Sequence, residues 1–121
     1  MDIQNNLYTE FVQAGFHPYV DIVRKPHEHE CAALARSYRH EVDGEKAHAY
    51  SIVIRIFDMY RIPNYPKVPE QRYIFEAHVS YYRLLGDVEL PATNVHYVVK
   101  SVREATDHAY RLWVAMGQST E

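Results

Sequence analysis

Two long stretches of the chain, residues 46–62 and 72–85, alternate apolar and mixed positions with a period of two and are rich in Val, Ile, Tyr and Phe. β-branched and aromatic residues in such an alternation favour pleated strands over helices. One face of each stretch is wholly apolar and carries Tyr50, Ile52, Ile54 and Ile56 in the first, and Tyr73, Phe75, Ala77, Val79 and Tyr81 in the second. The pattern therefore predicts a long antiparallel hairpin over residues 46–85.

The opposite face of this hairpin mixes polar with apolar side chains. Its apolar members are Val53, Phe57, Met59, Ile74 and Tyr82. A sheet face with so many apolar side chains is not left in water, so we expect a further helix, a second subunit or a partner protein to cover it. This face is therefore the first candidate for an interaction surface.

The segment that joins the two strands contains three prolines, Pro63, Pro66 and Pro69. Proline fixes φ, removes a backbone donor and disfavours a helical conformation in the residue before it. The sequence therefore predicts an exposed, stiff and irregular connection that presents Tyr65.

Apolar residues at helical spacing occur near both ends of the chain. Residues 3–15 predict a short amphipathic helix that ends at Gly15, where a left-handed conformation is easily adopted. Residues 93–117 carry an apolar stripe opposite a charged one. They predict a longer helix, capped by Thr93 or Asn94, that lies across the apolar face of the hairpin.

Residues 27–42 fit two backbone states. Pro26 before the start, an alanine-rich centre and basic residues towards the end favour a helix. Against this, apolar and polar residues alternate from 38 to 42, ahead of Asp43 and Gly44, which form a typical hairpin turn. We predict a helix over 27–42 and keep the strand as the alternative.

Together these elements predict an α+β fold in a single domain of residues 1–121. The predicted antiparallel sheet is built around the 46–85 hairpin and packed by helices at 3–15, 27–42 and 93–117, with a short strand at 19–23. A chain of this length buries enough surface to fold without disulfides or metals.

Composition changes this picture little but excludes several classes of protein. Hydrophobic residues make up 47% and charged residues 24% of the chain, as in ordinary globular proteins. A formal net charge of -3 argues against a generic nucleic-acid binder, which depends on positive charge. The single cysteine excludes an intrachain disulfide, and no apolar stretch is long enough to cross a membrane. With a start unlike a secretory leader, the sequence indicates a cytoplasmic protein.

The most conspicuous polar cluster runs from His27 to Cys31 and contains three residue types that bind zinc. On a strand, His27, His29 and Cys31 would share one face, and a metal-dependent hydrolase is one alternative function. The spacing differs from the HExxH motif, in which two imidazoles lie on one helical face. We therefore expect a polar segment that leads into a buried cysteine, and no cofactor.

A second alternative is the binding of single-stranded nucleic acid by a sheet face that carries rings and guanidinium groups. The residues concerned are Tyr82, Arg55, Arg61 and Arg72. However, residues 72–76 lack the glycine of an RNA-recognition motif and include a glutamate. Tyrosine and arginine are equally typical of protein interfaces, so we expect a protein rather than a nucleic acid as partner.

No serine lies in a nucleophile-elbow motif, and the sequence contains no glycine-rich phosphate loop. The sequence therefore favours a non-catalytic binding or regulatory protein that acts on another protein or on itself, as a homodimer. A compact chain without catalytic motifs would suit an inhibitory accessory protein of a phage or mobile element. The surface expected to carry this function comprises Arg55, Phe57, Met59, Arg61, Tyr65, Ile74 and Tyr82.

Overall fold

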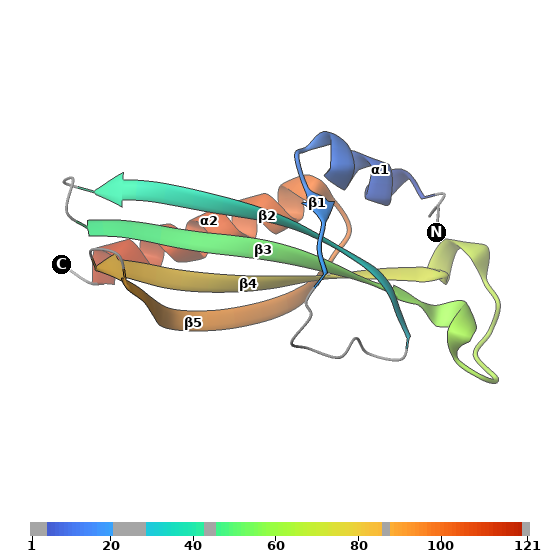
Figure 1. Cartoon of the computed structure of the whole chain (residues 1–121). Helices are drawn as coiled ribbons and strands as arrows, with labels where there is room; N and C mark the ends of the chain where they lie inside the picture. Colours follow the sequence, from blue (N-terminus) through green and yellow to red (C-terminus); the bar gives the residue numbers. More distant parts are fainter. Residues whose placement is uncertain (1–4, 21–28, 43–45, 86–87, 120–121) are drawn as a thin grey trace.

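The computed structural model describes residues 5–20, 29–42, 46–85 and 88–119. The described part forms an antiparallel five-stranded sheet with a helix near each end of the chain, which confirms the α+β prediction (Figure 1). The strands lie side by side in the order in which they occur along the sequence. They are β1 (His17–Pro18), β2 (Glu30–Val42), β3 (Lys46–Asp58), β4 (Tyr73–Leu85) and β5 (Val88–Val99), and the helices are α1 (Asn6–Gln13) and α2 (Val102–Ser119).

The hairpin predicted over residues 46–85 is present as β3 and β4, which are paired along their whole length. Its predicted apolar face is buried, and Ile52, Ile54 and Ile56 have no exposed surface. β3 is also paired with β2 on its other side, so it is the central strand of the sheet.

The helix predicted over residues 27–42 is wrong where the structure describes this segment, because residues 30–42 form β2. The alternative, a strand, is correct. Pairing with β3 satisfies the backbone groups on one side of β2. Leu34 is fully buried, and the ring of Tyr38 stacks on that of Tyr50 with centroids 4.8 Å apart. Burial and pairing in the sheet outweigh the helix propensity of the alanines, which is worth only tenths of a kcal/mol per residue.

The helix predicted over residues 93–117 begins later than expected, at Val102. Residues 88–99 form the edge strand β5 instead, paired with β4. Val95 and Val99 fit a helical period, but a β-branched residue favours a strand where a neighbouring strand is available. Neither α1 nor α2 is apolar enough over a sufficient length to span a lipid bilayer.

Both helices begin at a polar cap. The Oδ1 atom of Asn5 accepts hydrogen bonds from two backbone N–H groups and begins α1. The Oγ atom of Ser101 accepts a hydrogen bond from the N–H of Glu104 at 3.0 Å and begins α2. The caps predicted for this helix, Thr93 and Asn94, lie in β5.

α1 confirms the described part of the helix predicted over residues 3–15, and it ends ahead of Gly15, whose φ is 93°. The short strand predicted over residues 19–23 occurs earlier, as β1, and the second half of that range lies outside the described residues. The predicted turn at Asp43 and Gly44 also lies outside them.

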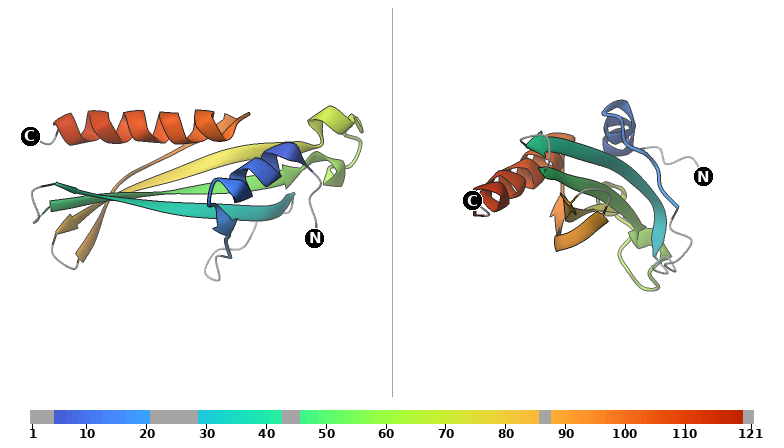
Figure 2. Two further views of the ribbon diagram at one scale, coloured as in Figure 1. Left: turned by 90° about the horizontal axis from the view of Figure 1, so that it is seen from above. Right: turned by 60° about the vertical axis from the view of Figure 1, so that its left-hand side comes forward.

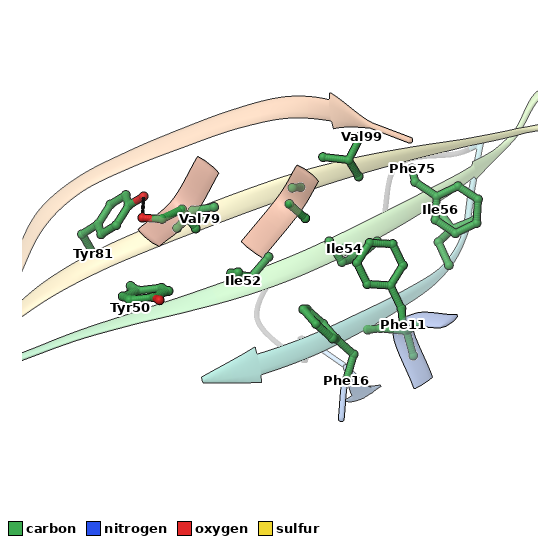
Figure 3. Close-up of a cluster of buried hydrophobic side chains, with 14 residues drawn as sticks. Phe11, Phe16, Tyr50, Ile52, Ile54, Ile56, Phe75, Val79, Tyr81 and Val99 are labelled. Carbon is green, nitrogen blue, oxygen red and sulfur yellow. Dashed lines mark hydrogen bonds between the residues drawn. The ribbon is translucent and has the colours of Figure 1, made fainter. Parts of the chain in front are cut away.

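Both helices pack on the same face of the sheet and enclose the core with it (Figure 2). α1 contributes Phe11, whose ring stacks on Phe75 of β4 with centroids 6.2 Å apart. α2 approaches the sheet closely because small residues face it, and Ala105 and Ala109 have no exposed surface. The hydroxyl of Tyr81 donates a hydrogen bond of 2.9 Å to the carbonyl oxygen of Ala109 (Figure 3).

Neither described helix lies on the opposite face of the sheet, which we call the second face. The second face comprises Ala33, Ala35 and Ser37 of β2, Ser51, Val53, Arg55 and Phe57 of β3, Ile74, Glu76, His78 and Ser80 of β4, and Asn94, His96 and Val98 of β5.

The close approach of α2 to the sheet leads to a stability prediction. Ala109→Leu adds a larger side chain at a site without free surface and should lower the free energy of unfolding by about 1–3 kcal/mol. The matched control is Ala115→Leu on the exposed side of the same helix, which should change it by less than about 0.5 kcal/mol. Urea unfolding followed by circular dichroism measures both, and equal losses would contradict this packing.

Candidate functional site

The second face carries its side chains in rows that cross the strands, because paired residues point to the same side of a sheet. The serine row is Ser37, Ser51, Ser80 and Asn94, the histidine row is Ala35, Val53, His78 and His96, and a third row is Ala33, Arg55, Glu76 and Val98. The middle of the second face is therefore polar, and its β3 and β4 residues agree with the mixed face that the alternation predicts.

A hollow of about 450 Å³ lies over the serine row and is lined further by the histidine row and Tyr19. The hollow forms there because serine side chains are short and leave space above the sheet. Hydroxyl, amide and imidazole groups offer both donors and acceptors, so the hollow can hydrogen-bond a neutral polar group.

Arg55 is held inside the sheet by an ion pair with Glu30. Its guanidinium lies 3.1 and 3.3 Å from the two carboxylate oxygens, and the two side chains are 9% and 7% exposed. Because the pair is buried, removing either charge alone would leave the other charge without compensation. Arg55 was predicted as a surface contact, but its charge is already satisfied within the chain.

His78 lies between Glu76 and His96 on the second face. Its Nε2 atom is 2.6 Å from Oε1 of Glu76, at an angle unsuited to a hydrogen bond, and its ring stacks on that of His96 with centroids 5.4 Å apart. Burial lowers the pKa of His78, and this outweighs the opposing effect of the Glu76 carboxylate. The imidazole is therefore mainly neutral at neutral pH, so the contact with Glu76 is not an ion pair there.

The segment between β3 and β4 contains two short 3-10 turns, η1 (Met59–Arg61) and η2 (Pro69–Gln71), and is braced at its base. Arg72 donates hydrogen bonds of 3.1 and 3.2 Å to the carboxylate of Asp58, and the N–H of Met59 donates to the carbonyl oxygen of Arg72 at 2.6 Å. Burial alone would raise the pKa of Asp58, but the hydrogen bonds from Arg72 and from the N–H of Tyr60 lower it overall.

The tip of this segment is tied down as well. The Nζ atom of Lys67 donates a hydrogen bond of 2.7 Å to the carbonyl oxygen of Tyr60 and lies 5.4 Å from the centre of its ring. The stiff connection predicted from the prolines is thus held by specific contacts, and Tyr65 is half-buried on it.

At the base of this segment a second hollow, of about 540 Å³, opens at the end of the sheet, and we call it the end hollow. β4 begins at Tyr73, but its pairing with β5 begins only at Phe75, so the first residues of β4 have no neighbour on that side. The space is lined by Asn5, Leu7, Tyr65, Glu70, Gln71, Tyr73, Ile74, Phe75, Val98, Val99 and Lys100.

Two residues of the predicted interaction surface, Tyr65 and Ile74, meet in the end hollow. Sequence reasoning missed Val98, a third member, which is 56% exposed. Val98 belongs to the apolar stripe of the helix predicted over residues 93–117, but it lies in the strand β5. Reading the alternation from Val95 to Val99 at a period of two would have placed Val98 on the second face.

The other predicted surface residues are dispersed. Phe57 is half-buried and is paired with Ile74 across β3 and β4. Met59 is buried, with 8% of its surface exposed, and Arg61 is exposed and donates to the carbonyl oxygen of Glu30 at 3.3 Å. Tyr82 lies in β4, but its side chain is outside the described part.

The cluster considered for zinc is only partly described, since His27 lies outside the described residues. Within the described part no group of three or more His, Cys, Asp or Glu side chains could hold a metal ion. Cys31 is the extra residue at a shift in the register between β2 and β3, and burial raises the pKa of its thiol. Cys31 is therefore a thiol, not a thiolate, at neutral pH.

The arginines considered for nucleic-acid binding are engaged with the protein itself. Arg72 pairs with Asp58 and lies over the rings of Tyr60 and Tyr73, at 4.7 and 4.9 Å from their centres. Arg55 is buried in its pair with a carboxylate. The guanidinium of Arg55 is therefore not presented to a phosphate, whereas the side chain of Arg72 is 41% exposed and Arg61 is exposed as well.

Comparison with models of known protein families, with curated proteins and with solved structures finds no match to this chain. The function therefore has to be argued from the geometry of the chain itself.

Because the ion pair of Arg55 and Glu30 is buried, we expect a single substitution to destabilise the protein more than a double substitution does. Glu30→Leu leaves the arginine charge buried without a partner and should cost about 3–5 kcal/mol in the free energy of unfolding. The double variant Glu30→Leu with Arg55→Leu removes both charges and should recover most of this loss. Urea unfolding of both variants tests it, and a double variant as unstable as the single one would contradict a structural role for the pair.

The lowered pKa of Asp58 predicts an acid-dependent contribution to stability. Its carboxylate stabilises the fold above the unfolded-state pKa of about 3.9, and this contribution is lost as the pH falls through the lower folded-state pKa. Asp58→Asn should therefore be less stable than the native chain at pH ~7, and the difference should shrink below about pH 4. Thermal unfolding across this pH range measures it, and a constant difference would argue against the pair with Arg72.

Proposed function

We propose that this protein is a non-catalytic binding protein that takes up an apolar side chain of another protein in the end hollow. The observation that carries the proposal is the meeting of Tyr65, Ile74 and the exposed Val98 around one space at the end of the sheet.

The lining of the end hollow resembles the centre of a protein interface. Its walls are the apolar side chains of Leu7, Tyr73, Ile74 and Val98, and polar residues such as Glu70 and Lys100 line it as well. Interfaces concentrate their binding energy where an aromatic or aliphatic anchor enters an apolar site that is surrounded by polar groups. An exposed segment of a protein with a Leu, Ile, Met or Phe side chain would fit this chemistry.

The segment that carries Tyr65 is already held in place. The ion pair of Asp58 with Arg72 closes its base, and Lys67 ties its tip to Tyr60. A wall ordered before binding costs less conformational entropy when a partner arrives. The bracing contacts therefore support a binding role for a segment whose prolines alone would only stiffen it.

Two parts of the wider function remain predictions from the sequence. The cytoplasmic location rests on the single cysteine, which makes no demand for an oxidising compartment, and an inhibitory role rests on the absence of catalytic motifs. A metal-dependent hydrolase remains the alternative, and metal analysis of untagged protein tests it directly, since near-stoichiometric zinc would support it.

Photo-crosslinking in the native cell tests the proposed site even while the partner is unidentified. A photoreactive phenylalanine analogue at position 65 should crosslink to a discrete protein. The same probe at position 110, an exposed tyrosine on α2 that does not line the end hollow, serves as control. No crosslinked protein at position 65, or the same set from both positions, would contradict the proposal.

The identified partner then allows a quantitative prediction. Ile74→Asp places a charge in the end hollow and should weaken binding at least about tenfold, or ~1.4 kcal/mol. Val12→Asp, at an exposed valine of α1 outside the hollow, should leave the affinity unchanged. Calorimetry with the purified proteins measures both, and circular dichroism shows that each variant is folded. Tyr65→Ala gives a second, uncharged test of the same wall.

A further inference from the structure

The two edges of the sheet differ in how they are protected from pairing with another strand. On one side, the two-residue strand β1, which includes Pro18, pairs only with Leu34 and Ala35 of β2. The uncovered remainder of that edge of β2 contains the charged residues Arg36, Arg39 and Glu41. Short strands, proline and charge are the usual protection of an edge. On the other side, β5 is a strand of 12 residues, and no described element is paired with its outer edge (Figure 1).

β5 itself is protected at one end and unprotected at the other. Its first half contains Glu89 and Pro91, and its register with β4 shifts between Tyr81 and Tyr82. Residues 94–99, with the sequence NVHYVV, contain no charged residue, proline or glycine. A segment of high β-propensity without these residues on an open edge is of the kind that pairs with another strand.

The flank of α2 above this edge is exposed and carries charges of both signs. His108 lies on this flank, because its ring centroid is 4.2 Å from the ring centroid of Tyr97 in β5. The opposite flank carries Trp113, whose ring centroid is 6.4 Å from that of Tyr50 in β3. The exposed residues on the β5 side, at helical spacing, are Glu104, His108, Arg111 and Ala115.

We propose that residues 94–99 of β5 pair antiparallel with the same residues of a second copy of this chain, about a two-fold axis perpendicular to the sheet. Such pairing continues the antiparallel pattern and joins the two sheets into one. It keeps the second faces of both copies on the same side and brings the exposed Val98 into contact with the partner.

A second copy is favoured over an unrelated strand because the helix flank is complementary to itself. A two-fold axis near the centre of residues 94–99 makes the two α2 helices antiparallel, with the two His108 residues near the axis. Glu104 and Arg111 are two turns apart on α2, on either side of His108. Each Glu104 then faces the partner's Arg111, so opposite charges meet twice.

This inference goes beyond the proposed function, because it concerns a second copy of the chain and not another protein. The edge shares Val98 and Val99 with the end hollow, whereas residues 94–97 and the helix flank lie outside it. Light scattering of the native chain across a range of concentrations should give the mass of a dimer. A monomer at every concentration would overturn the inference, and so would a growing polymer, because a two-fold interface closes. Neither result would affect the crosslinking at position 65.

Matched variants locate the interface. His96→Lys adds a charge in the middle of the unprotected stretch, outside the end hollow, and should raise the dimer dissociation constant at least about tenfold. His17→Lys makes the same change at the exposed histidine of β1 on the opposite edge and should leave it unchanged. Equal effects of the two variants would overturn pairing through β5.

A charge swap tests the helix contact separately. Arg111→Glu should weaken the dimer, because like charges then meet across the axis, and adding Glu104→Arg should restore it. Concentration-dependent protection of the amides of residues 94–99 in hydrogen exchange provides a readout independent of any substitution. A dimer without such protection would place the interface elsewhere and overturn the inference.

Discussion

The burial of the β3 isoleucines in one core with the alanines of α2 is the interaction on which the rest of the structure depends. Ile52, Ile54 and Ile56 have no exposed surface, and burying each is worth roughly 1.5–3 kcal/mol. Ala105 and Ala109 make this possible, because a larger side chain would hold the helix away from the sheet. With the centre of the sheet fixed in this way, β2 and β4 pair on either side of β3 and the edges follow.

Both described helices lie on one face of the sheet. The second face must therefore be stable without a helix to cover it. The chain achieves this with short polar side chains in the serine row, stacked imidazoles and the buried pair of Arg55 with Glu30. Val53 lies in the middle of this face, whereas Phe57, Ile74 and Val98 lie towards the end of the sheet where the 59–72 segment is braced. The candidate binding site is therefore at that end and not across the whole face.

The residues of the predicted interaction surface do not lie together in the structure. Their positions depend on tertiary contacts that sequence periodicity cannot show. Alternation placed Arg55 and Ile74 on the same face correctly, but it could not show that Glu30 approaches Arg55 from a strand predicted as a helix. Met59 follows the last residue of β3, where a 3-10 turn replaces the alternation and directs the side chain inward. The end hollow was beyond prediction because it is formed by residues from α1, the 59–72 segment, β4 and β5.

The sequence alone determined the β3–β4 hairpin, its buried face, the N-terminal helix and the α+β class. These features follow from local periodicity, and no other part of the chain is needed to recognise them. Tertiary structure decided the state of residues 30–42 and 93–99, where alanine or valine patterns fit helix and strand alike. The pairing with β3 and β4 settled both, because hydrogen bonds and burial along a neighbouring strand outweigh propensity differences of a few tenths of a kcal/mol per residue.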